Sequence, residues 1–218
     1  MIEHSSRRHQ IALNTSIRLA GYFYEMYRPG ETMVSPKKVI RVLNEAKVNF
    51  VLMGAHGVGS WRQSTRSTKD VDVLVVKRDI AKAVRVLHEA FPKLEVVDTT
   101  VVVRFVDPKK KESLIDVMKP VQTVFQMAFK HTVAIGETHR IPSLEMALVS
   151  KFAAMISPHR IAMRKMQDAA DFMDIVVGNR DDIDLKKLRR LAEQTYKGGG
   201  KEILALVNDT IAGRTIRI

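Results

Sequence analysis

Two aspartates separated by one residue, Asp70 and Asp72, begin an apolar run that extends through Val76. If this run is a β-strand, both carboxylates point to the same side, because side chains alternate along a strand. Neighbouring carboxylates repel one another, and beside a buried strand they are costly unless a cation lies between them. Carboxylate oxygens suit a hard cation such as Mg²⁺ or Mn²⁺. The alternative is that Asp70 ends a loop and both acids are solvated.

A third acid, Asp116, interrupts another apolar run, Leu114–Met118. A carboxylate among apolar strand residues must be paired, solvated or bound to a cation. Three acids from two neighbouring strands can form a two-metal site that activates a hydroxyl and stabilises a departing pyrophosphate. We therefore take Asp70, Asp72 and Asp116 as the candidate catalytic and metal-binding residues.

The residues around these acids are suited to binding phosphate. The apolar run 49–53 is followed by Gly54-Ala55-His56-Gly57-Val58-Gly59-Ser60, a glycine-dense turn that we expect to enter a helix. Backbone N–H groups at such a turn can face a triphosphate. Arg66 and Thr68, just before the acids, add a positive charge and a hydroxyl for the same phosphates.

The elements that must position these residues follow from hydrophobic periodicity and from turn signals. We expect helices at 11–28, 36–47, 78–91, 120–129, 143–156, 161–177, 185–196 and 202–212. We expect strands at 49–53, 71–76, 94–97, 101–106, 113–118 and 131–135. The strands at 101–106 and 113–118 should form a hairpin, and Gly198-Gly199-Gly200 should be a hinge or loop.

This pattern predicts an α/β or α+β fold in three parts. Residues 1–34 would be an N-terminal helical extension, and residues 35–141 a core of mixed strands and helices. Residues 142–218, after Pro142, would be a C-terminal helical region. The candidate acids and the glycine turn all fall in the core, so the core should carry the chemistry.

Composition narrows the class of protein. The chain has 218 residues and no cysteine, which excludes disulfides and thiolate metal sites. No apolar run reaches the roughly 18 residues that a membrane helix needs, so we expect a cytoplasmic protein with no membrane partner. The formal net charge of +12 indicates an anionic partner such as a nucleotide or nucleic acid, although basic proteins are often merely soluble.

Together these features resemble the DNA-polymerase-beta-like nucleotidyltransferase superfamily, particularly its minimal bacterial members. The string Arg66-Ser67-Thr68-Lys69-Asp70-Val71-Asp72 matches the Arg-x-Thr-x-Asp-x-Asp pattern of those members in full. The glycine element allows two registers. Gly54-Ala55, directly after the strand, is the one we favour, and Gly59-Ser60 is the other.

The resemblance implies a nucleotidyltransferase-type mixed sheet flanked by helices. It also implies that Asp70 and Asp72 bind metal and that Asp116 supplies the third carboxylate, as the general base. The implied reaction moves a nucleoside monophosphate from an NTP to a hydroxyl acceptor and releases pyrophosphate. Two alternatives are a nucleotide or nucleic-acid binding module of the same fold without turnover, and a toxin-like member of a defence pair.

The resemblance continues weakly into the helical region. Lys151, on the helix 143–156, could reach a phosphate or could only snorkel beside the apolar stripe. On the next helix, Arg164 and Asp168 are expected to form a surface ion pair. If the acceptor is RNA, basic residues of this region should follow its backbone. They are Lys151, Arg160, Arg164, Lys165, Lys186, Lys187, Arg189 and Arg190.

Overall fold

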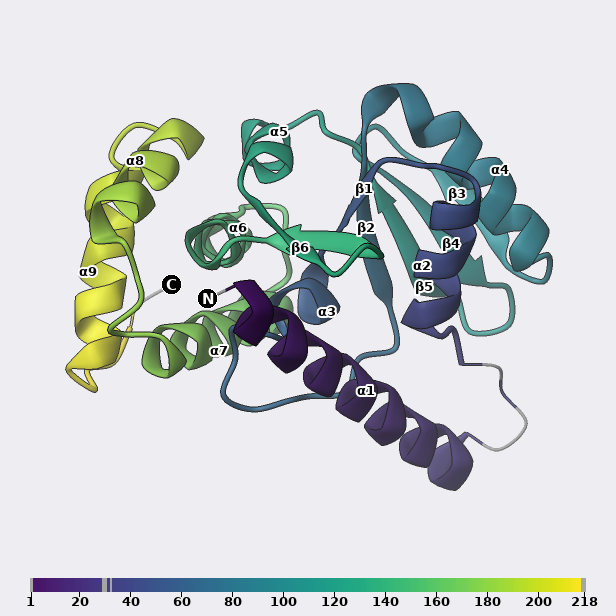
Figure 1. The fold of residues 1–218 in the computed structure, drawn as a ribbon, viewed down its shortest axis with the longest axis horizontal. Coiled ribbons are helices and arrows are strands. Elements are labelled where there is room, and N and C mark those ends of the chain that lie inside the picture. The colour runs from purple at the N-terminus through teal and green to yellow at the C-terminus, as the bar shows by residue number, and fades with distance from the viewer. Residues whose placement is uncertain (1, 29–30, 32, 217–218) are drawn as a thin grey trace. The chain divides into compact units, whose positions relative to one another are not determined.

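The computed structural model of the chain describes residues 2–28, 31 and 33–216 (Figure 1). The helices are α1 (Ile2–Tyr27), α2 (Pro36–Glu45), α3 (Gly54–Val58), α4 (Ile80–Ala90), α5 (Thr123–Lys130), α6 (Leu144–Ile156), α7 (Ala162–Gly178), α8 (Leu185–Thr195) and α9 (Gly199–Ile211). The strands are β1 (Phe50–Leu52), β2 (Val71–Val75), β3 (Glu95–Asp98), β4 (Val102–Asp107), β5 (Glu112–Met118), β6 (Thr132–Ile135) and β7 (His139–Pro142). Among the described residues, no helix combines the length and apolar character needed to cross a membrane.

The chain divides into two compact units. The first comprises the chain through Ser60 together with Thr65–Val121 and Thr132–Ile141. The second comprises Trp61–Ser64, Gln122–His131 and the chain from Pro142 onward. The chain therefore passes between the units several times, and α5 and the short segment 61–64 belong with the C-terminal helices.

A five-stranded mixed sheet forms the centre of the first unit, in the order β1-β2-β5-β4-β3. Strands β2 and β5 are parallel, whereas the other neighbouring pairs are antiparallel. The expected hairpin of β4 and β5 is confirmed. The expected fold class, a mixed sheet flanked by helices and followed by a helical region, is confirmed as well.

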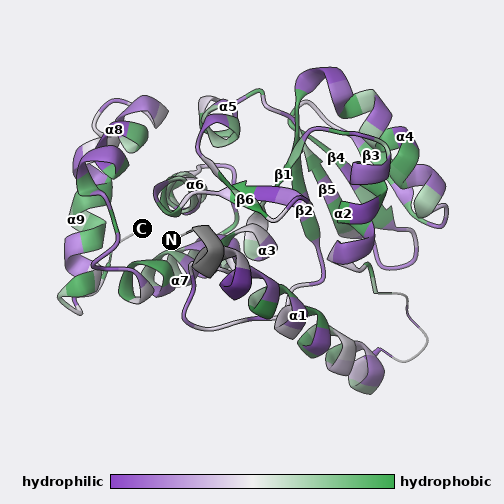
Figure 2. Ribbon diagram, in the orientation of Figure 1, coloured by the Kyte–Doolittle hydropathy of each residue, from purple (hydrophilic) through white to green (hydrophobic). Residues whose placement is uncertain are grey.

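Both sides of this sheet carry buried side chains. On one side, those of Val71, Val73, Val103, Phe105, Ile115 and Val117 are exposed by 1% or less. Helix α4 lies on this side, because Ile80 and Val84 line the same groove as Val96 and Val103. Figure 2 shows the resulting concentration of hydrophobic residues along β1, β2, β4 and β5.

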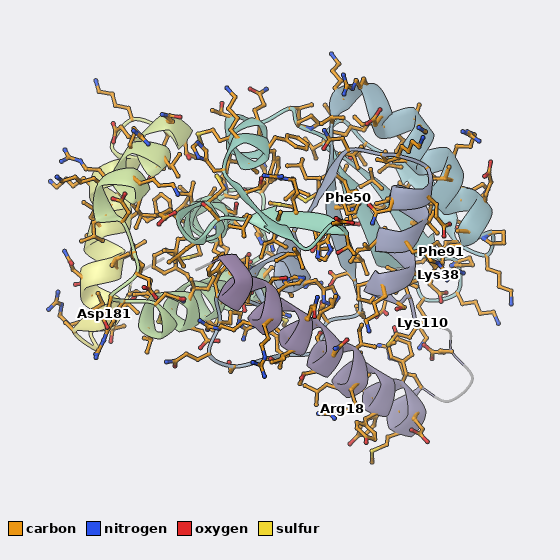
Figure 3. All side chains as sticks on the ribbon, in the orientation of Figure 1. Arg18, Lys38, Phe50, Phe91, Lys110 and Asp181 are labelled. Atoms are coloured by element: carbon orange, nitrogen blue, oxygen red, sulfur yellow. The ribbon has the colours of Figure 1, made fainter. Side chains whose placement is uncertain are left out.

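Helix α2 packs against α4 and completes this layer. Figure 3 shows Lys38 of α2 beside Phe91, at the end of α4. Nζ of Lys38 lies 4.4 Å from the centre of the Phe91 ring and donates a hydrogen bond of 3.0 Å to the carbonyl of Ala90. This ammonium group both caps a carbonyl at the end of α4 and makes a cation–π contact.

Helix α1 is longer than expected at its N-terminal end, because it begins at residue 2 rather than 11. The residues before Ile11 contain no proline or glycine to stop a helix. His9 on this added part is fully buried and contacts His139 of β7, a strand that the sequence analysis missed. Strand β7 is only four residues long and pairs with β6 alone, so its periodic signal is weak.

In the second unit, α6 packs against α7 and α8, and α8 packs against α9. The expected hinge or loop at Gly198-Gly199-Gly200 holds only for Gly198, which lies in the turn before α9, and is wrong for Gly199 and Gly200, which form the first turn of that helix. A β-carbon on Gly199 would lie 2.6 Å from the carbonyl oxygen of Ala192, and one on Gly200 would lie 2.8 Å from that of Arg189. These glycines therefore permit the close approach of α8 and α9.

Candidate active site

Two of the acids predicted from the sequence are direct neighbours on one side of the sheet. Asp72 of β2 and Asp116 of β5 are direct partners in the parallel pair. In-register residues of neighbouring strands point the same way, so both carboxylates lie on the side opposite Val71, Val73 and Ile115. Asp70 lies two residues before Asp72, immediately before the first residue of β2. Arg104 of β4, the partner of Asp116 in the antiparallel pair, lies on the same side.

Hydroxyl groups hold two of these carboxylates. Thr68 Oγ1 donates a hydrogen bond to Asp70 Oδ1, and Ser113 Oγ donates one to Asp116 Oδ1. An irregularity in the pairing of β4 with β5 makes Ser113, rather than Leu114, the partner of Val106. This extra residue brings Ser113 to the side of Asp116. The sequence analysis missed Ser113, because a bulge has no signature in an alternating pattern.

Arg104 also belongs to this face, although the sequence analysis did not select it. Its Nε lies 3.9 Å from Asp116 Oδ1, and about half of its side chain is exposed. An arginine at the next strand balances part of the negative charge of the three aspartates. It could have been found from the expected hairpin, since alternation places Arg104 opposite Asp116.

The backbone of Gly54 lies against the side chain of Asp72. Its φ is +58°, and a β-carbon at this position would lie 1.8 Å from Asp72 Oδ2. The Met53 N–H donates a 2.8 Å hydrogen bond to the Asp72 carbonyl and fixes this approach. Helix α3 begins at Gly54, which is the favoured register, while Gly59 follows the last residue of the helix.

The remaining residues of the glycine turn differ in exposure. Ser60 is 1% exposed, and its hydroxyl has no hydrogen-bond partner among the described residues. His56 is 5% exposed, and burial lowers its pKa to about 4, while the charge of Asp70 raises it and that of Arg66 lowers it. His56 is therefore a neutral imidazole at neutral pH, within electrostatic reach of two candidate site residues.

Lys69, which lies between Thr68 and Asp70, is held by an ion pair with Glu112. Lys69 Nζ lies 2.7 Å from Glu112 Oε1, and Arg28 Nη1 lies 2.9 Å from Glu112 Oε2. Hydrogen bonds from Arg28 and then Lys69 lower the pKa of Glu112 to about 2. Glu112 is the first residue of β5, so this ion pair attaches the segment before β2 to the strand that carries Asp116.

Lys151 lies in the second unit, in a buried cluster of charges. Its side chain is 8% exposed, and Nζ lies 2.9 Å from Asp168 Oδ1 and 2.7 Å from Asp171 Oδ2. Arg160 Nε lies 2.5 Å from the other oxygen of Asp168. The expected surface ion pair of Arg164 with Asp168 is wrong, because Asp168 is 2% exposed and pairs with Lys151 and Arg160 instead.

Within the described residues, no three or more histidine, aspartate or glutamate side chains are gathered in an arrangement that could hold a metal ion. Two of the carboxylates are instead engaged by hydroxyl groups, because Asp70 accepts a hydrogen bond from Thr68 and Asp116 accepts one from Ser113. The donor chemistry nevertheless fits Mg²⁺ or Mn²⁺, because the carboxylates of Asp72 and Asp116 are direct neighbours in the sheet and Asp70 lies two residues before Asp72.

The sequence matches no protein-family model, and a search of curated proteins gives no significant match. Among solved structures, the chain is similar to the antibiotic-resistance factor ANT(2'')-Ia, whose structure was determined in solution. The identity is 12%, the similarity covers 82% of this chain and 95% of that chain, and the TM-score is 0.47. A similarity at this level assigns neither a family nor an activity to the chain.

Proposed function

We propose that the protein is a metal-dependent nucleotidyltransferase, which moves a nucleoside monophosphate from an NTP to a hydroxyl acceptor and releases pyrophosphate. The observation that carries this proposal is the parallel pairing of Asp72 with Asp116, with Asp70 two residues before Asp72. Carboxylates that would repel one another on one side of a sheet indicate a cationic ligand. The Arg-x-Thr-x-Asp-x-Asp string supports the same interpretation.

In this proposal Asp70, Asp72 and Asp116 would hold Mg²⁺ or Mn²⁺, which would neutralise part of the charge of the phosphates. Asp116 accepts the proton of the acceptor hydroxyl. The hydroxyl oxygen then forms a bond to the α-phosphorus as the bond between the α-phosphorus and its bridging oxygen breaks, and pyrophosphate departs with that oxygen.

The glycine turn and the segment before β2 would position the triphosphate. Gly54 and Ala55 present backbone at the start of α3, beside Asp72, while Gly59 and Ser60 form the end of the same turn. Arg66 and Thr68 would contribute a charge and a hydroxyl. Thr68 would then exchange its hydrogen bond to Asp70 for one to phosphate.

Two measurements test this function. Titration calorimetry with ATP, GTP, CTP and UTP, each with and without Mg²⁺, should show binding of at least one NTP that strengthens with the metal, because phosphate oxygens complete its ligand shell. Incubation with NTPs labelled at the α-phosphate should then transfer label to an acceptor and produce pyrophosphate. Binding of equal strength without metal, or no binding, contradicts the site. Metal-dependent binding without turnover on any acceptor favours the alternative of a binding module.

A further inference from the structure

Helix α1 buries one face within the first unit. The buried residues recur every three or four positions and are exposed by 8% or less; they are Ala12, Leu13, Ser16, Ala20 and Tyr24. The helix packs against β6 and α3, which belong to the same unit. This face is enough to hold α1 in place, so apolar residues on its other side need another explanation.

A second apolar face of α1 is open to solvent. Leu19, Tyr22, Phe23 and Met26 follow one another at the spacing i, i+3, i+4 and i+7, and they are 40–71% exposed. Single exposed apolar residues are ordinary on protein surfaces, whereas neighbours along one helix face form a continuous patch. A patch of this kind indicates a surface that a partner covers.

The aromatic end of this patch is ordered without a partner. The centre of the Phe23 ring lies 5.4 Å from that of Tyr27, and the Arg28 guanidinium lies 5.6 Å from the centre of the Phe23 ring. Arg28 Nη1 in turn lies 2.9 Å from Glu112 Oε2 of β5. Since these contacts already restrict the side chains, a partner that binds here loses less entropy in ordering them.

The spacing of the patch favours another helix as its partner. Thr15, Leu19, Tyr22 and Met26 are separated by four, three and four residues, the alternation of the a and d positions of a coiled coil. Leu19 and Met26 take position a, and Thr15 and Tyr22 take position d. A helix can place its own side chains between residues spaced in this way.

The charges beside this seam favour a second copy of α1 in particular. Arg18 and Glu25 are exposed and lie seven residues apart, so both take position g. In an antiparallel pair of helices, the g positions face one another. Aligning Leu19 with Tyr22 of the second copy brings Arg18 beside Glu25 of that copy, and the two-fold symmetry makes this contact twice. A parallel pair would place Arg18 beside Phe23 instead.

Both charges are available for such contacts. Within the part of the chain that the structure describes, Arg18 and Glu25 form no ion pair, whereas Arg28 of the same helical segment pairs with Glu31 and Glu112. Figure 3 shows Arg18 projecting outward from α1. An antiparallel pair would therefore satisfy two opposite charges in each copy without breaking an existing contact among these residues.

The size of the patch suits a reversible dimer. Aromatic side chains bury about 150–250 Å² each, so the half-exposed seam offers on the order of 400 Å² in each copy. Arg18, Glu25 and Tyr27 beside the seam add to this area. Two copies then approach the roughly 1,200 Å² of the smaller stable interfaces, for which we expect a dissociation constant in the micromolar range.

We propose that α1 is a self-association surface, through which two copies of the chain pair as antiparallel helices. Leu19, Tyr22 and Met26 form the apolar seam, and each Arg18 lies beside the Glu25 of the other copy. The proposal concerns association alone and does not rest on nucleotidyl transfer.

Charge reversal tests both the partner and the orientation. Arg18→Glu and Glu25→Arg each create two like-charge contacts in the dimer, so each should raise the dissociation constant by about tenfold or more in sedimentation velocity over a concentration series. An equimolar mixture of the two variants should dimerise again, because every reversed charge then meets its opposite. The variant that carries both substitutions should dimerise as well. Arg85→Glu reverses an exposed arginine of α4 and should change nothing.

The apolar seam has its own test. Tyr22→Ser and Met26→Ser should each weaken the dimer by more than tenfold, because residues at the centre of an interface contribute most. Met163→Ser, at a similarly exposed position on α7, is the matched control. Circular dichroism should show unchanged helix content in every variant, which separates lost association from lost folding.

Three results would overturn the proposal. One is a protein that stays monomeric up to about 100 µM, well above the expected dissociation constant; sedimentation of that monomer with anionic lipid vesicles would assign the patch to a membrane surface instead. Another is a dimer that no α1 variant weakens, which would place the interface elsewhere. The third is a pair of weakened single variants whose mixture does not recover, because this result contradicts the antiparallel contact of Arg18 with Glu25.

Discussion

The backbone of Gly54 lies against the carboxylate of Asp72, so that a β-carbon at position 54 would be 1.8 Å from Asp72 Oδ2. Glycine is required here for two separate reasons, the positive φ of +58° and the lack of space. The start of α3 and the acidic strand are thereby fixed to one another. A side chain at position 54 has to displace Asp72 or the turn itself.

Gly54→Ala should cost much more stability than Gly136→Ala. Both glycines have a positive φ, but a β-carbon on Gly136 would have nothing within 4 Å. The left-handed conformation should cost about 1–2 kcal/mol in each variant, and the clash with Asp72 adds to this only at Gly54. Urea denaturation of the two variants would measure the difference. Equal losses would mean that the contact with Asp72 relaxes freely.

Replacing the acids singly should abolish transfer without unfolding the protein. Asp70→Asn and Asp72→Asn each remove one of the carboxylates on a single side of the sheet, so the melting temperature without metal should hold or rise. We expect kcat to fall by about a hundredfold or more, the scale seen when one group that stabilises a transition state is removed. Thermal melts and single-turnover assays check both points, with Asp181→Asn as a surface control. A marked loss of stability in both variants would identify these acids as structural.

Lys151→Met should destabilise the protein strongly rather than merely weaken NTP binding. It would leave Asp168 and Asp171 without the cation that they share in a buried place, a loss of about 3–5 kcal/mol. Adding Asp171→Asn to Lys151→Met should recover part of the stability, because it removes one of the two carboxylates that Lys151 neutralises. Chemical denaturation of the single and double variants tests this. A stable Lys151→Met protein with weakened NTP affinity would instead support a direct contact with phosphate.

The acidic strand and its neighbours could be predicted from the sequence because their signals are local. Alternation along β2 places Asp70 and Asp72 on one side, whereas the side that Asp116 takes depends on the register between β2 and β5, which the sequence does not fix. The position of Lys151 could not be predicted in this way, since the same amphipathic helix accommodates a snorkelling lysine and a buried one. Its burial is decided by Asp168 and Asp171 on another helix, and by Arg62 far earlier in the chain.

The contact between the histidines of α1 and β7 also could not be predicted from local sequence signals. It suggests that the stability of the protein depends on pH. His9 Nε2 and His139 Nε2 lie 3.0 Å apart, in a pairing between residues 130 positions apart in the chain. Burial, together with the charges of His139 and His56, lowers the pKa of His9 to about 3, and burial lowers that of His139 to about 4. Their pKa in the unfolded chain is about 6.5. The folded state thus holds both rings neutral where the unfolded state binds protons.

The free energy of unfolding should therefore fall as the pH falls below about 6.5, and the contribution of the two rings should be fully present above that value. Each of these histidines can contribute up to about 1.4 kcal/mol per pH unit between its unfolded and folded pKa. Urea midpoints measured from pH 7.5 to 4.5 would give the slope. His9→Met combined with His139→Met should flatten it, whereas His159→Gln, at an exposed position, should leave it unchanged. An identical slope in the double variant would exclude these two rings as its source.

RNA remains our proposed acceptor to test, because a net charge of +12 exceeds what one triphosphate needs. The structure divides the basic residues of α8 into two kinds. Lys186, Arg189 and Arg190 are exposed, whereas Lys187 Nζ lies 2.6 Å from the buried Glu145. We therefore expect the three exposed residues to contact an RNA backbone, and Lys187 to stabilise the helical unit.

Filter binding with a structured RNA should show affinity that falls steeply as salt rises, because neutralised phosphates release counterions. Charge reversal at Lys186, Arg189 and Arg190 together should weaken binding and lower the slope of log K against log salt by roughly 0.7–0.9 for each phosphate that is no longer neutralised. Lys187→Glu should instead lower stability, since it places a second acid beside Glu145, and thermal melts would show this. If no RNA is retained at low salt, the excess charge serves another purpose, and a small hydroxylated molecule becomes the acceptor to test.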